Sequence, residues 1–414
     1  GAGLKALIFE MKPVKFSPAH RNTDLAELVC SNSLRSASIE SAVGLLKEEM
    51  RLLGSIVMSA ADQTRIPAGE ALAVDRERFS RLITERIAGS EKIKIIREEA
   101  TNLPEGRQVI IAAGPLASDP LSGKIAELVG MESLYFYDAI APVIDAGSID
   151  YDKTFAASRY GKGEGDDYLN CPMTAGEYER FIDALLTAEL AELHPFDKPR
   201  FFEGCMPIEE IARGGRDSPA YGPMKPVGLD APERFGRPYA IVQLRAENRE
   251  KSAYNIVGFQ TRLKIYEQKR IFRMIPGLEN AEFLRYGSSH RNTFINSPGL
   301  LNERLRLRSN PEIFFAGQIT GVEGYVESAA CGLYAGIAAV KTVRGEDFSP
   351  PSDETALGAL LKHLRLKKGN FQPSNVNYSL IAPLEKPHRK SERKKLIAER
   401  ALIKIREWQK QSHV

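Results

Sequence analysis

The sequence has few cysteines, no long apolar run and little net charge, and each shortage argues against a class of protein. Its four cysteines, Cys30, Cys171, Cys205 and Cys331, form no C-x-x-C pair, which disfavours a disulfide framework or a zinc site, so we expect reduced thiols and no metal. The sequence contains no run of about 18 apolar residues, which is the length needed to span a bilayer. Because the N-terminus also lacks the pattern of a signal peptide, we expect a cytoplasmic protein. The net charge of +3 is too small to indicate nucleic acid by itself.

The length of 414 residues is too great for one typical compact core, so we expect two domains or one domain with a large insertion. Over 1–144 and 301–385, buried strands run into small-residue turns, which is typical of a parallel sheet beside a nucleotide site. Over 145–300 the chain has more aromatic residues and alternating strands such as 239–244, with a helix around 175–193. The sequence therefore predicts an α/β fold with an inserted, mainly antiparallel α+β domain that binds the substrate.

The first ten residues carry part of a dinucleotide-binding fingerprint. Gly1 and Gly3 match its glycine turn, and residues 5–9 match its second strand, which ends in the ribose-binding acid Glu10. That acid should follow the turn by about 20 residues, but Glu10 stands only 7 positions after Gly3. The first strand and the phosphate-binding helix are therefore missing around residues 4 and 5. Either the numbering skips these residues or they are deleted, and a flexible glycine-rich terminus is the alternative interpretation.

Two later segments continue the nucleotide-binding pattern. A buried strand over 109–113 runs into Gly114, and another over 313–316 runs into Gly317. A helix rich in small residues follows, and its N-terminus would offer free amides and a positive dipole end to a phosphate or an electron-rich ring. Together with the first ten residues, this predicts a glutathione-reductase-like FAD-binding Rossmann domain. The candidate cofactor-binding residues are Gly1, Gly3, Glu10, Gly114, Gly317, Gly321, Val322, Gly324 and Tyr325.

Two cysteines are candidates for catalysis. Cys205 lies in the window 201–209, between a glycine and a Met-Pro pair with carboxylates on both sides. That window alone favours a buried, unreactive cysteine, because nearby carboxylates oppose a thiolate. Cys30 ends an apolar run and opens a polar Ser-Asn-Ser turn, where an accessible thiol is more common than inside a helix. Three further candidates for substrate binding are Lys225, His290 and Arg291, each of which is also an ordinary structural or surface residue.

The C-terminal segment 386–414 is rich in lysine and arginine, with apolar residues interleaved among them. This spacing predicts an amphipathic basic helix. One interpretation is a solvated terminal helix, and the other is contact with the phosphate backbone of nucleic acid. The sequence by itself does not choose between them.

Eight segments of the chain, spread almost from end to end, carry a family resemblance. They are 28–34, 67–76, 168–173, 201–209, 222–228, 274–281, 290–293 and 321–325. In these segments the chain resembles the folate- and flavin-dependent tRNA uracil-5-methyltransferases, which make ribothymidine in the T-loop of bacterial tRNA. It departs from that family at the N-terminus, where the phosphate-binding helix is missing.

The resemblance implies a reaction and a role for each thiol. Methylenetetrahydrofolate would donate its one-carbon unit through reduced FAD to carbon 5 of the T-loop uridine of tRNA, and NAD(P)H would reduce the flavin again. Cys205 would add to carbon 6 of uracil, and Cys30 would be a second thiol near the flavin that removes the carbon 5 proton; the two roles could be exchanged. Two alternatives remain, namely a sibling flavoenzyme acting on ribosomal RNA or the tRNA wobble uridine, and a flavin-free RNA-binding protein derived from the fold.

Overall fold

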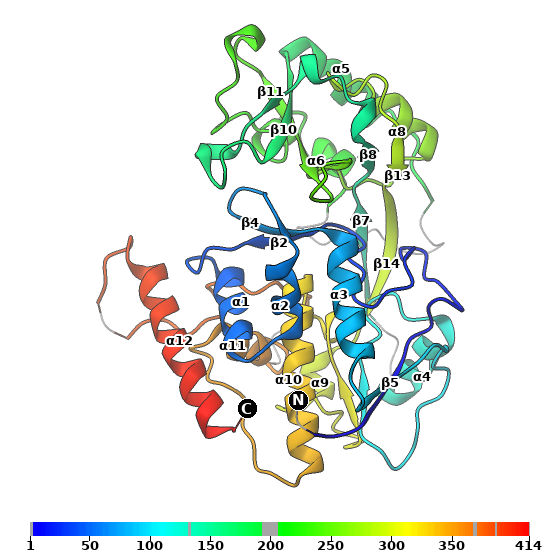
Figure 1. The fold of residues 1–414 in the computed structure, drawn as a ribbon, viewed down its shortest axis with the longest axis vertical. Helices are drawn as coiled ribbons and strands as arrows, with labels where there is room; N and C mark the ends of the chain where they lie inside the picture. The colour runs from blue at the N-terminus through cyan, green and yellow to red at the C-terminus, as the bar shows by residue number, and fades with distance from the viewer. Residues whose placement is uncertain (1–2, 131–133, 193–205, 367–370, 386, 414) are drawn as a thin grey trace.

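The computed structural model describes residues 3–130, 134–192, 206–366, 371–385 and 387–413, which form two lobes (Figure 1). Both ends of the chain lie in the larger lobe. Each lobe has a hydrophobic core of its own.

The two cores draw on different parts of the chain. The larger core contains Leu46, Tyr334 and Trp408, so it joins segments near both ends of the sequence. The second core contains Phe181 and Phe259, and it is formed mostly by the segment in between. The larger lobe is therefore interrupted by the smaller one, and the limits at 144/145 and 300/301 stay a prediction.

The parallel strands of the larger lobe form two separate pairs. The pairs are β1 (Ala6–Phe9) with β5 (Ile93–Ile96), and β6 (Val109–Ile111) with β15 (Ile313–Phe315). No strand among the described residues joins them. A continuous doubly wound sheet would be covered on both faces. Here Leu7, Phe9 and Ile110 are instead 50%, 46% and 39% exposed.

Helices surround these strands, and a small antiparallel sheet adjoins them. The helices are α1 (Ala42–Leu52), α2 (Ile56–Gln63), α3 (Arg76–Ala88), α4 (Asp119–Val129), α9 (Ser297–Leu300), α10 (Tyr325–Val343), α11 (Ala356–His363) and α12 (Arg393–Gln411). The sheet has the order β2 (Ser33–Ser36), β4 (Ala71–Val74), β3 (Arg65–Ile66). Ser41 caps α1 and Asp75 caps α3, each accepting a hydrogen bond from a first-turn amide. α1 contacts α10, α11 and α12, so it lies at the centre of this helical layer (Figure 1).

Two long strands connect the lobes. β7 (Leu134–Ile140) carries the chain into the smaller lobe, and β14 (Ser288–Phe294) brings it back (Figure 1). They pair antiparallel over their whole length.

The smaller lobe is built on one antiparallel sheet of six strands. Their order is β13 (Phe283–Arg285), β8 (Val143–Asp145), β12 (Ala253–Ile256), β11 (Ala240–Ala246), β10 (Tyr168–Met173), β9 (Phe155–Ala156). Among the described residues, the α-helices of this lobe are α5 (Ala175–Leu186), α6 (Ile208–Gly214), α7 (Ser218–Tyr221) and α8 (Ile265–Phe272). α5 starts at a capping box in which Thr174 and Glu177 satisfy each other's backbone amides.

The predicted fold class is confirmed, with two differences in detail. The helix expected over 175–193 ends at Leu186, and Leu190 instead bridges to Leu263. The expected amphipathic helix at the C-terminus forms as α12, but it is packed on the larger lobe. Among the described residues, no helix has both the length and the apolar character needed to cross a membrane.

Candidate active site around Cys30

Two arginines hold the backbone before Cys30. The Arg76 guanidinium donates hydrogen bonds to the carbonyl oxygens of Leu28 and Val29. Arg285 Nη1 donates to the same Val29 oxygen at 3.0 Å. Arg76 begins α3 in the larger lobe and Arg285 ends β13 in the smaller one. The position of Cys30 therefore depends on both lobes.

The residue pair after the cysteine is fixed by a buried amide. Asn32, fully buried, donates from Nδ2 to Val74 O at 3.0 Å and to Ala246 O at 2.9 Å. Its Oδ1 accepts a hydrogen bond from Arg245 Nε at 2.8 Å, and Arg245 Nη2 donates to Ser31 Oγ at 2.8 Å. Val74 is in β4 and Ala246 is in β11, so this amide joins strands of both lobes. The segment expected to be a polar turn is thus a buried structural link at Asn32.

Tyr325 contacts Cys30 directly. The tyrosine hydroxyl accepts a hydrogen bond from the Cys30 N–H at 2.8 Å and lies 2.9 Å from Sγ. Tyr325 begins α10 after Gly324, whose φ of 103° favours glycine, and a Cβ there would lie 2.5 Å from a Glu327 carboxylate oxygen. Burial of the hydroxyl raises the pKa of Tyr325 well above its ordinary value. The phenol therefore stays protonated and can donate to an ionised sulfur.

The charges around the thiol are unequal. Arg76 Nε and Nη2 contact the Glu247 carboxylate at 2.6 Å and 2.9 Å. Burial alone would raise the pKa of Glu247, but Arg76 lowers it by attraction and hydrogen bonding. Among the described residues Arg285 has no such carboxylate, and its buried Nε and Nη2 have no hydrogen-bond partner. Burial, followed by repulsion from Arg76, lowers the pKa of Arg285 to about 10. The surroundings of Cys30 therefore carry an excess of positive charge.

Three predicted cofactor-binding residues lie at the ends of parallel strands. Glu10 follows β1, Gly114 follows the β6 strand, and Gly317 follows β15. Because β6 and β15 are parallel neighbours, Gly114 and Gly317 share one edge. The Thr293 N–H in β14 donates to Pro115 O at 3.0 Å, which brings the end of β14 to the same edge. This edge is where an open α/β sheet binds its ligand.

Gly321 and Val322 are packed against the segment that begins at Phe371. The φ of Gly321 is 89°, and a Cβ there would lie 2.4 Å from the Phe371 ring. Val322 forms a parallel bridge with Ser374. In the described residues their contacts are structural, and their cofactor role stays a prediction.

Several candidates are not tested by these contacts. Cys205 and Gly1 lie outside the described residues, and so do the side chains of His290 and Arg291, whose backbone belongs to β14. Gly3 is described and exposed, with a φ of 83°. The predicted roles of these residues stay predictions.

The carboxylate that ends the Cys205 window is a structural anchor. Glu209 is fully buried and accepts hydrogen bonds from Thr261 Oγ1 at 2.9 Å and from the Arg262 N–H at 2.8 Å. Burial raises its pKa. It therefore fixes the start of α6.

Lys225 is partly exposed in a loop on the smaller lobe. The Ile241 N–H donates to Met224 O at 2.8 Å, and the Tyr160 N–H donates to Gly228 O at 2.7 Å. These contacts hold the loop beside β11, and no hydrogen bond or ion pair among the described residues joins it to the Cys30 segment.

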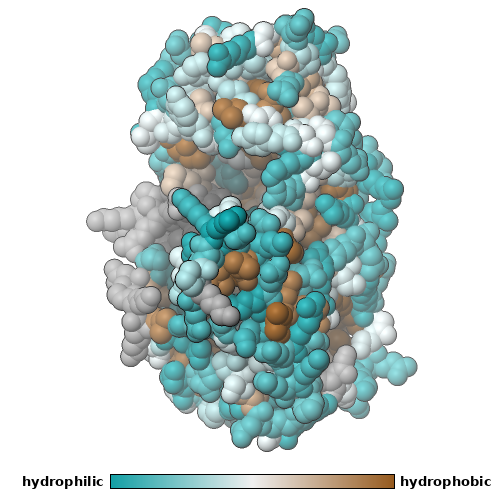
Figure 2. Space-filling view, turned by 90° about the vertical axis from the view of Figure 1, so that its left-hand side faces the viewer, coloured by the Kyte–Doolittle hydropathy of each residue, from teal (hydrophilic) through white to brown (hydrophobic). Residues whose placement is uncertain are grey.

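α12 presents a basic outer face. Its inner face buries Ile397, Ala401, Ile405 and Trp408 on the larger lobe, and Trp408 Nε1 donates to Ser349 O at 2.8 Å. The exposed cations are Arg393, Lys394, Lys395, Arg406 and Lys410. Figure 2 looks onto this side of the molecule, where the surface is mostly hydrophilic with small apolar patches.

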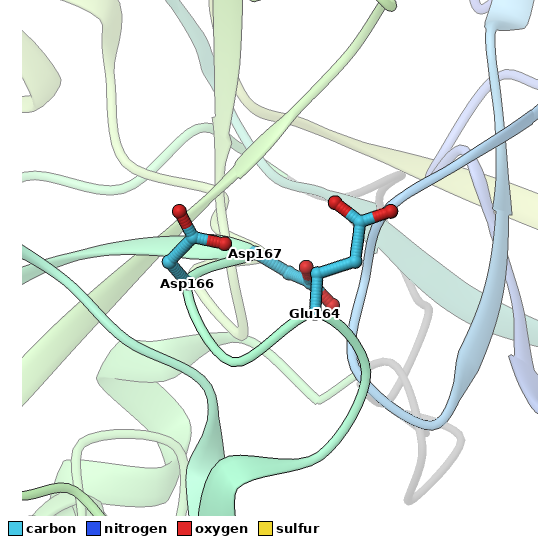
Figure 3. Close-up of side chains that lie close together, drawn as sticks. All are labelled: Glu164, Asp166 and Asp167. Carbon is cyan, nitrogen blue, oxygen red and sulfur yellow. The ribbon is translucent and has the colours of Figure 1, made fainter.

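Glu164, Asp166 and Asp167 form an acidic group between η3 (Arg159–Gly161) and β10 (Figure 3). Their carboxylate oxygens lie within 4.8 Å of one another. Glu164 and Asp166 are exposed, whereas Asp167 is buried and accepts a hydrogen bond from the Gly69 N–H of the larger lobe. Exposed acidic groups are common without a metal, so we assign Asp167 a structural role at the junction of the lobes.

Sequence reasoning did not single out the polar residues that hold the Cys30 segment. Asn32 and Arg76 fall within segments that carry the family resemblance, but neither is a predicted site residue. Arg245 carries a local signal, because it is a charged residue inside the otherwise buried strand β11. Arg285 carries none, and only its tertiary contacts reveal it.

Comparison with known proteins identifies relatives over nearly the whole chain. The family described as "Glucose inhibited division protein A" matches residues 2–347. The protein named Methylenetetrahydrofolate--tRNA-(uracil-5-)-methyltransferase TrmFO from Geobacter sulfurreducens is 58% identical over 409 residues, which cover 99% of this chain and 94% of that protein. The protein of the same name from Citrifermentans bemidjiense is 55% identical over 407 residues, covering 98% and 93%.

Two solved structures share the fold. They are Aquifex aeolicus GidA in its form II and form I crystals, each with a TM-score of 0.71. Their identities to this chain are 17% and 18%, each covers 99% of it, and the matches span 70% and 72% of those chains. At this identity the likeness establishes the two-lobed fold alone.

Proposed function

This chain belongs to the glucose inhibited division protein A family and to the TrmFO group of methylenetetrahydrofolate–tRNA-(uracil-5-)-methyltransferases, and on that premise we propose that it methylates carbon 5 of the T-loop uridine of tRNA. The observation that carries this proposal is the 58% identity to a named TrmFO protein over 99% of the chain. The one-carbon donor is methylenetetrahydrofolate, and NAD(P)H supplies the reducing equivalents.

FAD, when bound, carries the one-carbon unit and the reducing equivalents to uracil. The residues at the strand ends fit such a group. Gly114 and Gly317 both have positive φ. A Cβ at Gly114 would meet nothing within 4 Å, and at Gly317 the nearest atoms are 3.9 Å away. The sheet edge formed by Gly114 and Gly317 would hold the cofactor, together with Glu10 after β1 and the N-terminus of α10, which begins eight positions after Gly317.

The two thiols divide the chemistry at uracil. Carbon 5 is a poor nucleophile until a thiolate adds to carbon 6, and we assign that addition to Cys205. We assign removal of the carbon 5 proton to Cys30. Support for the second assignment comes from the Tyr325 hydroxyl, 2.9 Å from Sγ, and from the positive charge of Arg76 and Arg285 nearby.

The RNA must present an extruded base and be held by its backbone. A uridine inside a folded loop has to leave its base stack before carbon 5 can reach the catalytic thiols and the cofactor. The exposed cations of α12 are suited to phosphate contacts. An enzyme of tRNA modification works where tRNA is made and used, so a cytoplasmic location is part of the proposal.

The test is methyl transfer to a defined RNA. We expect a tRNA transcript to gain a methyl group at the T-loop uridine only when methylenetetrahydrofolate and NAD(P)H are both present. S-adenosylmethionine should not replace the folate. A methylated ribosomal RNA fragment with unmodified tRNA would instead favour the sibling enzyme, and a purified protein without flavin absorbance would favour the RNA-binding alternative.

Cysteine variants test the assigned residues. Cys205→Ala and Cys30→Ser should each abolish turnover, whereas Cys171→Ala is the matched control. Cys171 is fully buried and burial raises its pKa, so it takes no part in thiolate chemistry. Full activity of Cys205→Ala would contradict the assigned nucleophile.

A further inference from the structure

Arg285 forms no ion pair among the described residues, although Glu247 attracts it from a distance. Its Nη1 donates a hydrogen bond to the carbonyl oxygen of Val29, one residue before Cys30, at 3.0 Å. Its Nε and Nη2 are buried and have no hydrogen-bond partner. A buried cation without a partner is costly, so such groups are usually paired with an anion.

The neighbouring arginine differs from Arg285 in this respect. Arg76 makes two contacts with the Glu247 carboxylate, at 2.6 Å and 2.9 Å, so its charge is matched. Burial by itself would lower the pKa of Arg76, but attraction by Glu247 and the hydrogen bond to it, with smaller contributions, raise that pKa, whereas burial lowers the pKa of Arg285 to about 10. Glu247 contacts Arg76 directly and attracts Arg285 without a hydrogen bond, so Arg285 is the less well neutralised of the two arginines.

The nearby groups that titrate or carry charge come from four elements. They are Arg76 of α3, Arg285 of β13, Arg245 with Glu247 at the end of β11, and Tyr325 of α10. Three guanidinium groups face one carboxylate, and the phenol stays neutral because burial raises its pKa. Cys30 interacts with Arg76 and Arg285, and its thiol can supply a further negative charge to this set.

We propose that Arg285 is the counter-ion of a Cys30 thiolate and that the Tyr325 hydroxyl donates the hydrogen bond that completes the ion's shell. The tyrosine oxygen already accepts the Cys30 N–H at 2.8 Å, which leaves its own proton free to point at Sγ, 2.9 Å away. Ionisation releases the thiol proton to solvent. Cys30 is partly exposed, so that proton has a route out.

The ionised thiol explains how Cys30 could act as a base, and this part rests on the proposed function. In that step the carbon 5–hydrogen bond breaks, the proton bonds to Cys30 Sγ, and the electron pair stays on the uracil ring. Arg285 touches no substrate in this scheme. It is a positioning residue that keeps the sulfur in its basic form.

The experiment measures the thiolate without any RNA or folate. The ultraviolet absorbance of thiolate is titrated with pH in the full chain, and the signal of Cys30→Ser is subtracted so that only Cys30 contributes. Removing an opposite charge next to an ionised group shifts its titration by about one to three units. Arg285→Gln should therefore move the midpoint upward by at least about one pH unit, and Arg285→Lys should restore most of the shift.

A matched control separates charge from structure. Arg273 also donates to a backbone carbonyl, that of Ala281, at 3.1 Å and 2.9 Å, but it is not among the groups around Cys30. Arg273→Gln should leave the Cys30 midpoint unchanged. If Arg285→Gln fails to fold, Arg285→Lys and Tyr325→Phe still test the proposal, because loss of the tyrosine donor should also raise the midpoint.

Clear results would overturn the proposal. One is a Cys30 midpoint in the unaltered protein at or above the ordinary thiol value of about 8.5. Another is a midpoint that does not respond to Arg285→Gln or, where that variant does not fold, to Tyr325→Phe. A low midpoint in a protein that methylates no tRNA would refute the proposed function and leave the counter-ion intact. A protein that methylates tRNA but whose Cys30 titrates like an unperturbed thiol would refute the counter-ion proposal and leave the proposed function intact.

Discussion

The sharpest structural prediction concerns Asn32, the buried amide behind Cys30. Asn32→Ala removes two hydrogen bonds donated by Nδ2, to Val74 O and Ala246 O, and one accepted by Oδ1 from Arg245. The side chain is fully buried, so water does not replace these partners without entering the junction of the lobes.

The expected loss of stability follows from the groups left behind. Each buried polar group that loses its partner costs about 1–3 kcal/mol. Three such groups together set the upper limit of the stability loss. A water molecule trapped in the small polar cavity left by the amide would reduce that loss. We therefore expect Asn32→Ala to lower the free energy of unfolding by about 3–5 kcal/mol.

Denaturant unfolding followed by circular dichroism checks this value, with the midpoint and slope fitted for both proteins. The matched control is Asn377→Ala, which removes an exposed asparagine that bonds only its own turn. That change should stay within about 0.5 kcal/mol. A loss below about 1 kcal/mol for Asn32→Ala would refute the claim that this amide joins the lobes.

Three further predictions follow from single contacts. Tyr325→Phe leaves the Cys30 amide without its acceptor, so stability should fall by about 1–2 kcal/mol, measured by denaturant unfolding, and methyl transfer should slow in the same variant. Burial raises the pKa of Glu49 to about 8, so the folded state holds a proton that the unfolded state releases near its ordinary value of 4.5. Stability should thus fall as pH rises from about 4.5 to 8, a trend absent in Glu49→Gln and measured by unfolding at each pH. Replacing Lys394 and Lys395 by alanine should lower the salt dependence of tRNA binding by up to about two units of slope, in a filter-binding assay, if both touch phosphates.

The packing of α12 changes how its role has to be tested. Deleting the segment after residue 384 would remove Ile397, Ile405 and Trp408 together with the charges, and it would uncover the part of the larger core on which they pack. Loss of binding in such a truncation would not distinguish a phosphate contact from a damaged fold. Substitution of exposed lysines leaves the buried face of the helix intact and separates the two effects.

Local pattern was enough for the fold class and for the strand ends at which two candidate cofactor-binding glycines lie. Buried strands that end in Gly114 and Gly317 predicted the parallel strands, and these two glycines share a sheet edge. Alternation over 239–244 predicted a strand of the antiparallel lobe, where β11 lies. These signals are readable because side-chain periodicity and glycine turns are properties of neighbouring residues.

What only the tertiary structure decided is the environment of the candidate thiol. Family resemblance pointed to Cys30, but its hydrogen-bond contact comes from Tyr325, almost 300 positions away in sequence, and Arg76 and Arg285 hold the Val29 carbonyl just before it. Whether a thiol ionises depends on charges within a few ångströms, whichever part of the chain supplies them. The sequence by itself determined two lobes, their strand types and which cysteines to consider. The folded chain decided that one of these cysteines lies near an arginine whose buried Nε and Nη2 have no hydrogen-bond partner among the described residues, because that proximity is created only when the two lobes pack together.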